Sequence, residues 1–196
     1  MGSLPDRRVE KTREALYAAL VSEILSKGYD TVTIQDILDK ANAGRSTFYG
    51  HFSGKEDLLR FGFDRLRSHL AAERLRMGNE DKKAATRPFL LSLFSLRHAQ
   101  SHTQLYRAII GGRGGLVAQQ QIRAVIAEQI RLDIIGQKFD PEIPSGLIVE
   151  FLVGAFLSVL LYWIDKKSKL EPEAIDGMFK RIAQDGLKSL MQEATN

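Results

Sequence analysis

Hydrophobic positions recur at helical spacing along most of the chain. Over 6–27 they lie four or seven residues apart, so that one face of a helix is apolar. The members of that face are Val9, Leu16, Leu20 and Ile24. Gly28 stands just past this segment, at a position where helices commonly end. No stretch alternates convincingly with the period of two typical of a strand, and the pattern therefore predicts an all-α protein.

Breaks between the periodic segments divide the rest of the chain into further helices. Thr33 can cap one of them, because Asp36 follows three residues later in a pattern close to a capping box. Ser53 and Glu56 fit the same pattern at the start of a longer helix. We expect helices over 33–41, 45–51, 53 into the seventies, 83–100, 102–110, 116–137, 145–165 and 172–192. We also expect two domains, a small one over 1–52 and a larger helical bundle over 53–196.

Composition adds limits on the chemistry. The chain has 196 residues, 44% of them hydrophobic, which is enough to bury a full core. It has no cysteine, which excludes disulfides, cysteine nucleophiles and thiolate metal sites and agrees with a cytoplasmic protein. The net charge of +4 mildly favours a polyanionic partner. Because residues 1–60 hold nine basic and nine acidic residues, a positive patch there must come from their arrangement.

The segment 146–165 is nearly long enough to cross a bilayer, which takes about 20 apolar residues. Glu150 interrupts it early, and a carboxylate within a membrane span is costly. Glu150, Gly154 and Ser158 also form a small and polar stripe at helical spacing. We therefore expect a buried helix with one interface face, and a membrane anchor is the alternative.

A helix-turn-helix outline stands in the first fifty residues. The helix predicted over 33–41 is followed by a three-residue turn, 42–44, and by the short helix over 45–51. In such an outline the second helix enters the major groove of DNA. Phe48 and Phe52 would pack inward. Their expected neighbours are Leu16, Leu20, Ile37 and Leu38.

The polar residues of this outline suit contacts with DNA. Arg45 can donate two hydrogen bonds to guanine, and Thr47 can offer a methyl group or a hydroxyl. Tyr49, His51 and Lys55 carry donors that suit phosphates. The spacing of these residues alone leaves one alternative to DNA binding, a three-helix bundle whose polar residues merely face water.

The stretch TVTIQDILDKANAGRSTFYGHFSGKEDLL, 31–59, resembles the DNA-binding domain of the TetR family of one-component transcriptional regulators. The family pattern T-[LF]-Y-x-[HY]-F-x-x-K-E-x-L is matched from Thr47 to Leu58. The resemblance implies DNA contacts from Thr33, Gln35, Arg45, Ser46, Thr47, Tyr49, His51 and Lys55.

Two positions depart from the family pattern. Asn42 stands where the family usually has glycine, and asparagine tolerates the left-handed conformation that a turn can need. Gly44 replaces the usual serine at the N-cap of the recognition helix, a change that costs only about a few tenths of a kcal/mol. We expect the turn to survive both.

The C-terminal segment 151–190 is similar to the last two helices of TetR-family proteins, which implies a homodimer joined by a four-helix interface. The candidate interface residues are Glu150, Gly154, Ser158, Phe179 and Ile182. The family also implies a small-molecule effector cavity among the middle helices. The candidates there are Phe94, His98, Tyr106, Phe151, Phe156 and Trp163, although each is more simply explained as an ordinary core residue.

The sequence offers little support for a metal, a cofactor or catalysis. His98 and His102 share a helical face, but no cysteine or nearby acidic residue completes a metal site. The segment GGRGG, 111–115, lacks the ending of a phosphate-binding loop and is read as a helix connection. No nucleophile with its base stands out, so we expect no cofactor and no enzyme.

The sequence therefore predicts a cytoplasmic, homodimeric DNA-binding regulator. We expect a repressor that binds a palindromic operator in double-stranded DNA and is released by a small-molecule effector. A dimer that binds DNA without any effector is the main alternative, followed by a helical enzyme and a membrane-anchored regulator.

Overall fold

The computed structural model of the chain describes residues 7–80, 89–110, 115–135, 137–165 and 170–188. These residues form helices and connecting turns without a β-strand, which confirms the predicted all-α class. Residues 111–114 of the segment GGRGG and the N-terminal MGS lie outside the described residues.

The chain folds as two compact units. Unit 1 comprises Met1–Leu66 and Gln104–Gln121, and unit 2 comprises Arg67–Thr103 and Ile122–Asn196. Two long helices, α4 (Lys55–Glu80) and α7 (Gly115–Ile134), contribute residues to both units. The predicted functional division into 1–52 and 53–196 stays a prediction.

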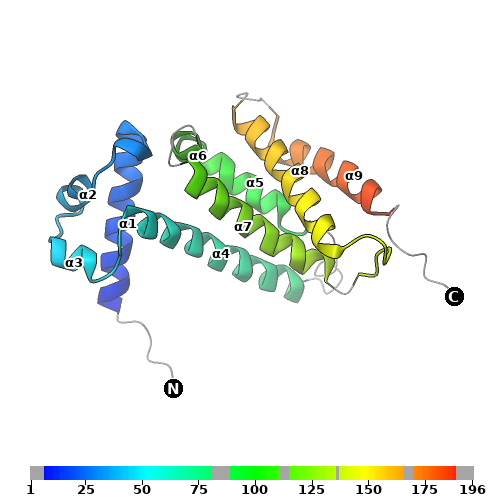
Figure 1. Cartoon of the computed structure of the whole chain (residues 1–196), viewed down its shortest axis with the longest axis horizontal. Coiled ribbons are helices and arrows are strands. Elements are labelled where there is room, and N and C mark those ends of the chain that lie inside the picture. Colours follow the sequence, from blue (N-terminus) through cyan, green and yellow to red (C-terminus); the bar gives the residue numbers. More distant parts are fainter. Residues whose placement is uncertain (1–6, 81–88, 111–114, 136, 166–169, 189–196) are drawn as a thin grey trace, which may run out of the picture. The chain divides into compact units, whose positions relative to one another are not determined.

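Unit 1 begins with α1 (Arg7–Lys27) and the single 3₁₀ turn η1 (Tyr29–Thr31). Two short helices follow, α2 (Ile34–Ala41) and α3 (Arg45–Tyr49), and they lie beside α1 in Figure 1. The first turns of α4 and most of α6 (Thr103–Ile110) complete the unit together with the start of α7. The sequence pattern missed η1, and α3 is two residues shorter than predicted.

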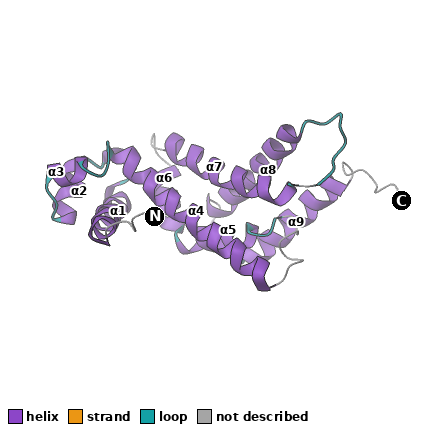
Figure 2. Cartoon of the chain, turned by 90° about the horizontal axis from the view of Figure 1, so that it is seen from below, coloured by secondary structure: helices purple, strands orange, loops and turns teal. Residues whose placement is uncertain are grey.

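Unit 2 contains α5 (Ser92–Ser101), α8 (Ser145–Asp165) and α9 (Pro172–Lys188), with the later turns of α4 and α7. The helices α8 and α9 contact each other along part of their length, and α5 contacts both (Figures 1 and 2). The helix predicted over 83–100 begins at Ser92, and residues 83–88 of the predicted start lie outside the described residues.

Phe48 and Phe52 are buried in unit 1, as predicted, and so are the four aliphatic residues that were expected around them. The guanidinium of Arg13 lies 4.3 Å from the ring centroid of Phe61 and 5.4 Å from that of Phe52, within cation–π range. This residue of α1 thus contacts two rings that flank the start of α4.

At Gly62 of α4, unit 1 has no room for a side chain. A Cβ atom there would lie 2.3 Å from the ring of Tyr17 on α1. The absence of a side chain at position 62 therefore lets the aromatic ring of α1 approach the backbone of α4.

Lys55, the first residue of α4, forms hydrogen bonds with backbone carbonyls of unit 1. Its Nζ donates hydrogen bonds to the carbonyl oxygens of Tyr29 (2.9 Å) and Val32 (2.8 Å), and more weakly to that of Asp30 (3.5 Å). It also lies 4.6 Å from the ring centroid of Tyr29. The ammonium group thereby joins the start of α4 to the backbone around η1, where the Tyr29 carbonyl also accepts from the Val32 N–H (3.3 Å).

We expect Lys55→Met to lower the free energy of unfolding by about 1–3 kcal/mol, because partly buried carbonyls lose a charged donor. Urea unfolding followed by circular dichroism measures the loss. Lys40→Met, at an exposed position of α2, is the matched control and should leave the midpoint unchanged. Equal midpoints for the two variants would contradict the role given to Lys55.

Candidate nucleic-acid interface

The first helix of the helix-turn-helix outline, α2, begins with the predicted capping box. The backbone N–H of Asp36 donates to Thr33 Oγ1 (3.2 Å), and the backbone N–H of Thr33 donates to Asp36 Oδ2 (2.7 Å). A hydrogen bond from Lys27, and then those from Thr33, hold the pKa of the Asp36 carboxyl well below its usual range. Because the Thr33 hydroxyl also donates to Asp36, its proton is already used within the helix. A DNA contact from Thr33 stays a prediction.

The turn between α2 and α3 has the geometry expected of a helix-turn-helix. Asn42 adopts the left-handed conformation, with φ 50° and ψ 49°, and its N–H caps the end of α2. Gly44 is extended, with φ −81° and ψ 156°, at the N-cap of α3. The substitution of Asn42 for the usual glycine therefore leaves the turn intact, as predicted.

The third helix, α3, is fixed to unit 1 through its aromatic residues. Phe48 is fully buried, and its ring centroid lies 6.0 Å from that of Phe52 and 5.4 Å from that of Tyr49. Because Phe48 points inward, its neighbours in this short helix face outward. The exposed ones are Arg45, Ser46, Thr47 and Tyr49.

A chain of side-chain hydrogen bonds joins α3 to α2. Arg45 Nη2 donates to Gln35 Oε1 (3.1 Å), and Gln35 Nε2 donates to Asp39 Oδ1 (2.8 Å). The two bonds together define which way the Gln35 amide points, because its oxygen faces Arg45 and its nitrogen faces Asp39. Asp39 was not among the predicted residues, although its position four residues after Gln35 on one helix face is a signal for such a pair.

The residues after α3 differ partly from expectation. His51 is half-buried beside the ring of Phe52. Ser53 bonds to Asp57 rather than to the predicted Glu56, because both its N–H (2.9 Å) and its hydroxyl (3.2 Å) donate to the Asp57 carboxylate. Lys55 was predicted to contact phosphate. Its ammonium group already donates to three carbonyls of its own chain, and a phosphate contact stays a prediction.

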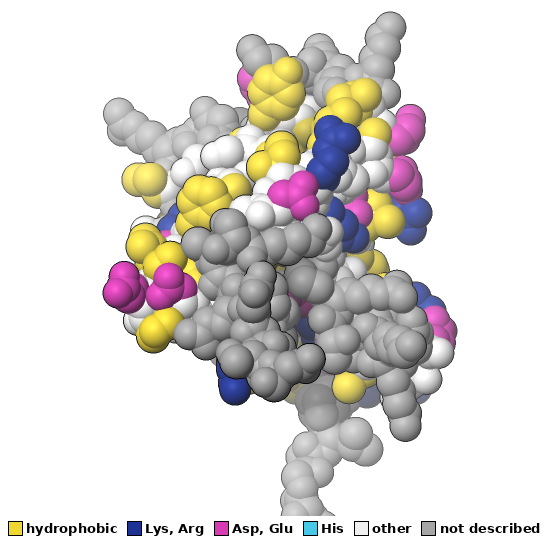
Figure 3. Space-filling model, turned by 90° about the vertical axis from the view of Figure 1, so that its right-hand side faces the viewer, with side chains coloured by type: hydrophobic (Ala, Val, Ile, Leu, Met, Phe, Trp, Pro, Cys, Tyr) yellow, Lys and Arg dark blue, Asp and Glu magenta, His cyan; other side chains and the backbone are white. Residues whose placement is uncertain are grey.

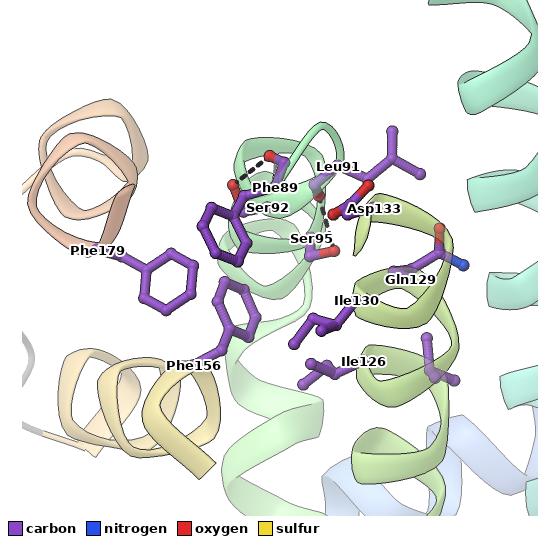
Figure 4. A pocket seen from close by; sticks show the side chains of 11 residues that line it. Phe89, Leu91, Ser92, Ser95, Ile126, Gln129, Ile130, Asp133, Phe156 and Phe179 are labelled. Atoms are coloured by element: carbon purple, nitrogen blue, oxygen red, sulfur yellow. Dashed lines mark hydrogen bonds between the residues drawn. The ribbon is translucent and has the colours of Figure 1, made fainter. Parts of the chain in front are cut away.

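Unit 2 contains a small cavity between α5, α7, α8 and α9, with a volume of about 30 Å³ (Figure 4). Three phenylalanine rings form its apolar end, since the centroid of Phe179 lies 5.0 Å from those of Phe89 and Phe156. Phe89 has a positive φ of 59°, which is rare for a bulky residue. The remaining lining residues are Leu91, Ser92, Ser95, Val125, Ile126, Gln129, Ile130 and Asp133.

The polar side of the cavity is linked to α4. Arg74 donates to Asp133 Oδ1 (2.7 Å) and to the side chain of Gln129. Burial raises the pKa of the Asp133 carboxyl, and the hydrogen bond from Arg74 partly offsets this effect. Ser92 and Ser95 donate to carbonyls within their own helical turn. None of these polar residues was among the predicted candidates. Gln129 and Asp133 lie four residues apart on α7, and this spacing was a signal in the sequence for a polar site.

Of the six predicted cavity residues, Phe156 lines this cavity. Phe151 was predicted to line it and does not, because 69% of its surface is exposed. Trp163 is a core residue whose indole N–H donates to the carbonyl of Leu170 (2.9 Å). Phe94 is half-buried and lies outside the lining, and Tyr106 belongs to unit 1.

His98, the sixth predicted cavity residue, stacks on His102 with ring centroids 4.4 Å apart. Burial, with His102 and His69 nearby, lowers the pKa of His98 to about 4. Within the described part of the chain, no group of three or more His, Asp or Glu residues could hold a metal ion.

The candidate dimer residues separate into two groups. Phe179 is buried against two rings inside unit 2, so its assignment to an interface is corrected. Ile182 is 74% exposed, Ser158 is exposed, and Gly154 has open space where a Cβ would lie. Glu150 forms an exposed ion pair with Arg123.

Hydrophobic side chains are exposed on the surface, as Figure 3 shows for one face. The helices α8 and α9 supply several of the exposed ones in the described chain, namely Leu147, Phe151, Tyr162, Met178 and Ile182. On α8 these positions lie on the same face as Gly154 and Ser158. We name this set, with Gly154 and Ser158, the α8–α9 face.

By length and composition, α8 could cross a membrane. Eight of its residues, however, are buried inside the described structure, and the core helix of a soluble protein can have the same length and apolar composition. The apolar character of α8 is accounted for by its packing in unit 2 and by the α8–α9 face.

Two family models match the chain. The family of bacterial regulatory proteins of the tetR type matches residues 16–60, and a transcriptional regulator C-terminal region matches residues 87–185. YxbF of Bacillus subtilis strain 168, described as an uncharacterized HTH-type transcriptional regulator, is 49% identical over 55 residues. That match spans 28% of this chain and only 14% of the length of YxbF.

Solved structures share the fold at low sequence identity. A TetR transcriptional regulator from Streptococcus agalactiae 2603V is 22% identical with a TM-score of 0.68, over 91% of this chain and 96% of that one. NalD, described as the secondary repressor of the MexAB-OprM multidrug efflux pump in Pseudomonas aeruginosa, is 18% identical with a TM-score of 0.62, over 96% of this chain and 100% of that one.

Unit 1 contains a helix-turn-helix, formed by the capped helix α2, the turn at Asn42 and the helix α3 with its buried Phe48 and exposed polar face. The two family models match residues in this element and residues as far as α9. The chain belongs to the tetR family of bacterial regulatory proteins, which are DNA-binding transcriptional regulators and not enzymes.

Proposed function

We propose that this regulator is a cytoplasmic homodimeric repressor that binds a palindromic operator and leaves it when a small molecule occupies unit 2. The observation that carries the proposal is the exposed polar face of α3, held outward because Phe48 is buried. Repression is the sign we propose, and NalD, which shares the fold, is a repressor by its description.

Arg45 is the residue we propose for base recognition. One of its five N–H donors is bonded to Gln35, so others can reach O6 and N7 of a guanine. The bonds from Arg45 to Gln35 and from Gln35 to Asp39 orient the guanidinium before DNA arrives, which lowers the entropy cost of binding. Ser46 and Thr47 offer hydroxyls at the same face, and Tyr49 and His51 serve phosphates in this proposal.

We expect Arg45→Ala to weaken binding to the preferred operator by about 1–3 kcal/mol, or roughly 5- to 150-fold, because one guanine contact is lost. Selection from a random duplex pool, followed by fluorescence anisotropy, measures both affinity and base preference. The variant should lose its preference at one position of each half-site. Arg131→Ala, which removes an exposed arginine from α7, should select the wild-type sequence. An unchanged preference in Arg45→Ala would refute the base-reading role.

The α8–α9 face supports the dimer in this proposal. Its exposed side chains come from two helices that contact each other, so they form one surface of large apolar groups beside small ones. Burying such a surface against a second copy removes apolar area from water and lets α8 approach its mate at Gly154 and Ser158.

We expect Ile182→Glu to shift the protein from dimer to monomer in sedimentation velocity, because a charge would enter the centre of an apolar interface. Operator binding should weaken with it, since two recognition helices would no longer be joined. Ile135→Glu is the matched control, because Ile135 is 77% exposed and Ile182 is 74% exposed. A dimer that survives Ile182→Glu would remove the α8–α9 face from the proposal.

The cavity of unit 2 is the proposed effector site. At about 30 Å³ it is far smaller than the roughly 300–1,000 Å³ of typical ligand pockets, so an effector would have to part the rings of Phe89, Phe156 and Phe179. Asp133 on the cavity wall is bonded to Arg74 of α4, whose first turns belong to unit 1. To weaken DNA binding a hundredfold, an effector must favour the non-binding state by about 2.7 kcal/mol.

The small volume of the cavity also favours a second candidate function, a DNA-binding dimer that has no effector. The two functions differ in one observation, because only a protein with an effector site gains thermal stability from a ligand.

We expect Ser95→Leu to abolish thermal stabilisation by small aromatic alcohols and amines while leaving DNA affinity unchanged, because the added side chain fills the cavity. A thermal-shift screen of one- and two-ring compounds measures the response. Ser101→Leu is the matched control: both serines lie on α5 and donate to the carbonyl four residues earlier, and Ser101 is exposed. Equal responses in both variants would exclude this cavity as the effector site.

A further inference from the structure

Unit 1 has a second feature beside α3, a groove of about 370 Å³ between α1 and the turn that precedes α3. One wall is the first half of α1, with Arg8, Lys11 and Thr12. The opposite wall is the turn over 41–44 with Thr47 of α3. None of the described residues that line the groove is acidic.

The α1 wall of this groove carries positive charge on one face. Arg8 and Lys11 are three residues apart, which places them one above the other on the helix, and both are exposed. The nearby acidic residue Glu10 has its carboxylate 4.0 Å from Arg13. The guanidinium of Arg13 also lies over the rings of Phe52 and Phe61. Arg13 thus has a packing role in unit 1, whereas Arg8 and Lys11 form an exposed pair at the groove.

The opposite wall leaves space for a bulky occupant. Gly44 has no side chain, and a Cβ atom there would meet only the hydroxyls of Ser46 and Thr47, at 3.9 and 4.0 Å. Thr47 and Thr12 line the groove, and the Thr12 hydroxyl donates to the Arg8 carbonyl (3.0 Å). Two cations with hydroxyls beside them suit a phosphodiester rather than an apolar ligand.

The groove also adjoins the proposed DNA-reading face. Thr47 belongs both to the groove wall and to the exposed face of α3. A helix in the major groove has a sugar–phosphate backbone on each side of it. The backbone that borders the major groove on the α1 side of α3 would therefore pass this basic pair.

We propose that Arg8 and Lys11 bind the phosphodiester backbone of DNA in this groove, as a contact additional to those of α2 and α3. The proposal rests on the proposed DNA-binding function. The contact contributes affinity and salt dependence without base preference, because phosphates are the same at every step of the sequence.

The test compares wild-type protein, Arg8→Gln/Lys11→Gln and a control that loses the same charge elsewhere, Arg131→Gln/Lys138→Gln. Both control positions are exposed and lie in unit 2. Fluorescence anisotropy is measured in KCl between about 50 and 200 mM on a duplex that the wild type selects from a random pool, and on a scrambled duplex.

We expect the slope of log affinity against log salt to fall by about 0.9 for each lost phosphate contact in the Arg8/Lys11 variant. The affinity should fall by the same factor on both duplexes, and the control should keep the wild-type slope. Lys11→Gln alone should lose about half of the effect, and circular dichroism melting checks that each variant folds.

A wild-type slope in the Arg8/Lys11 variant overturns the proposal and leaves the proposed function standing. A loss confined to the selected duplex also overturns it, because it would assign these residues to base recognition. If the wild type selects no sequence, the proposed operator binding fails, and the slope on the scrambled duplex still decides whether Arg8 and Lys11 contact phosphate.

Discussion

The burial of Phe48 is the interaction on which the proposed DNA-binding surface depends. A helix of five residues cannot persist by its own hydrogen bonds, because helix nucleation is unfavourable and isolated short helices melt in water. Packing of Phe48 and Phe52 in unit 1 supplies the stability that α3 lacks, and it fixes the rotation of the helix. The outward direction of Arg45 and Tyr49 follows from that one inward residue.

Local patterns in the sequence were sufficient for the elements and for the turn. The capping box of Thr33 and Asp36, the left-handed Asn42 and the inward phenylalanines each depend on residues a few positions apart, and the structure confirms them. Lys55 could not be placed in the same way, because its carbonyl partners lie 23 to 26 residues earlier in the chain.

Apolar helices posed a different problem. Phe151 and Phe156 on α8, like Phe179 and Ile182 on α9, look alike in a hydrophobicity pattern, yet one of each pair is buried in its own chain and the other is exposed. Which apolar residue faces a neighbour depends on how α5, α8 and α9 rotate against one another, and sequence spacing does not report that rotation. The bond between Asp133 and Arg74 could not be predicted for another reason, because the two residues are 59 positions apart in the chain.

The hydrogen bonds from Arg45 to Gln35 and from Gln35 to Asp39 have an evolutionary consequence. A substitution at Arg45 leaves the Gln35 carbonyl oxygen without its donor, and a substitution at Gln35 leaves both neighbours without a partner. If α3 reads bases as proposed, a replacement at Arg45 therefore also changes the surroundings of Gln35 on α2, so the two helices are coupled in adaptation to a new operator. Among relatives with diverging operators, positions 35, 39 and 45 should vary together, and this covariation would keep the repertoires of duplicated regulators apart.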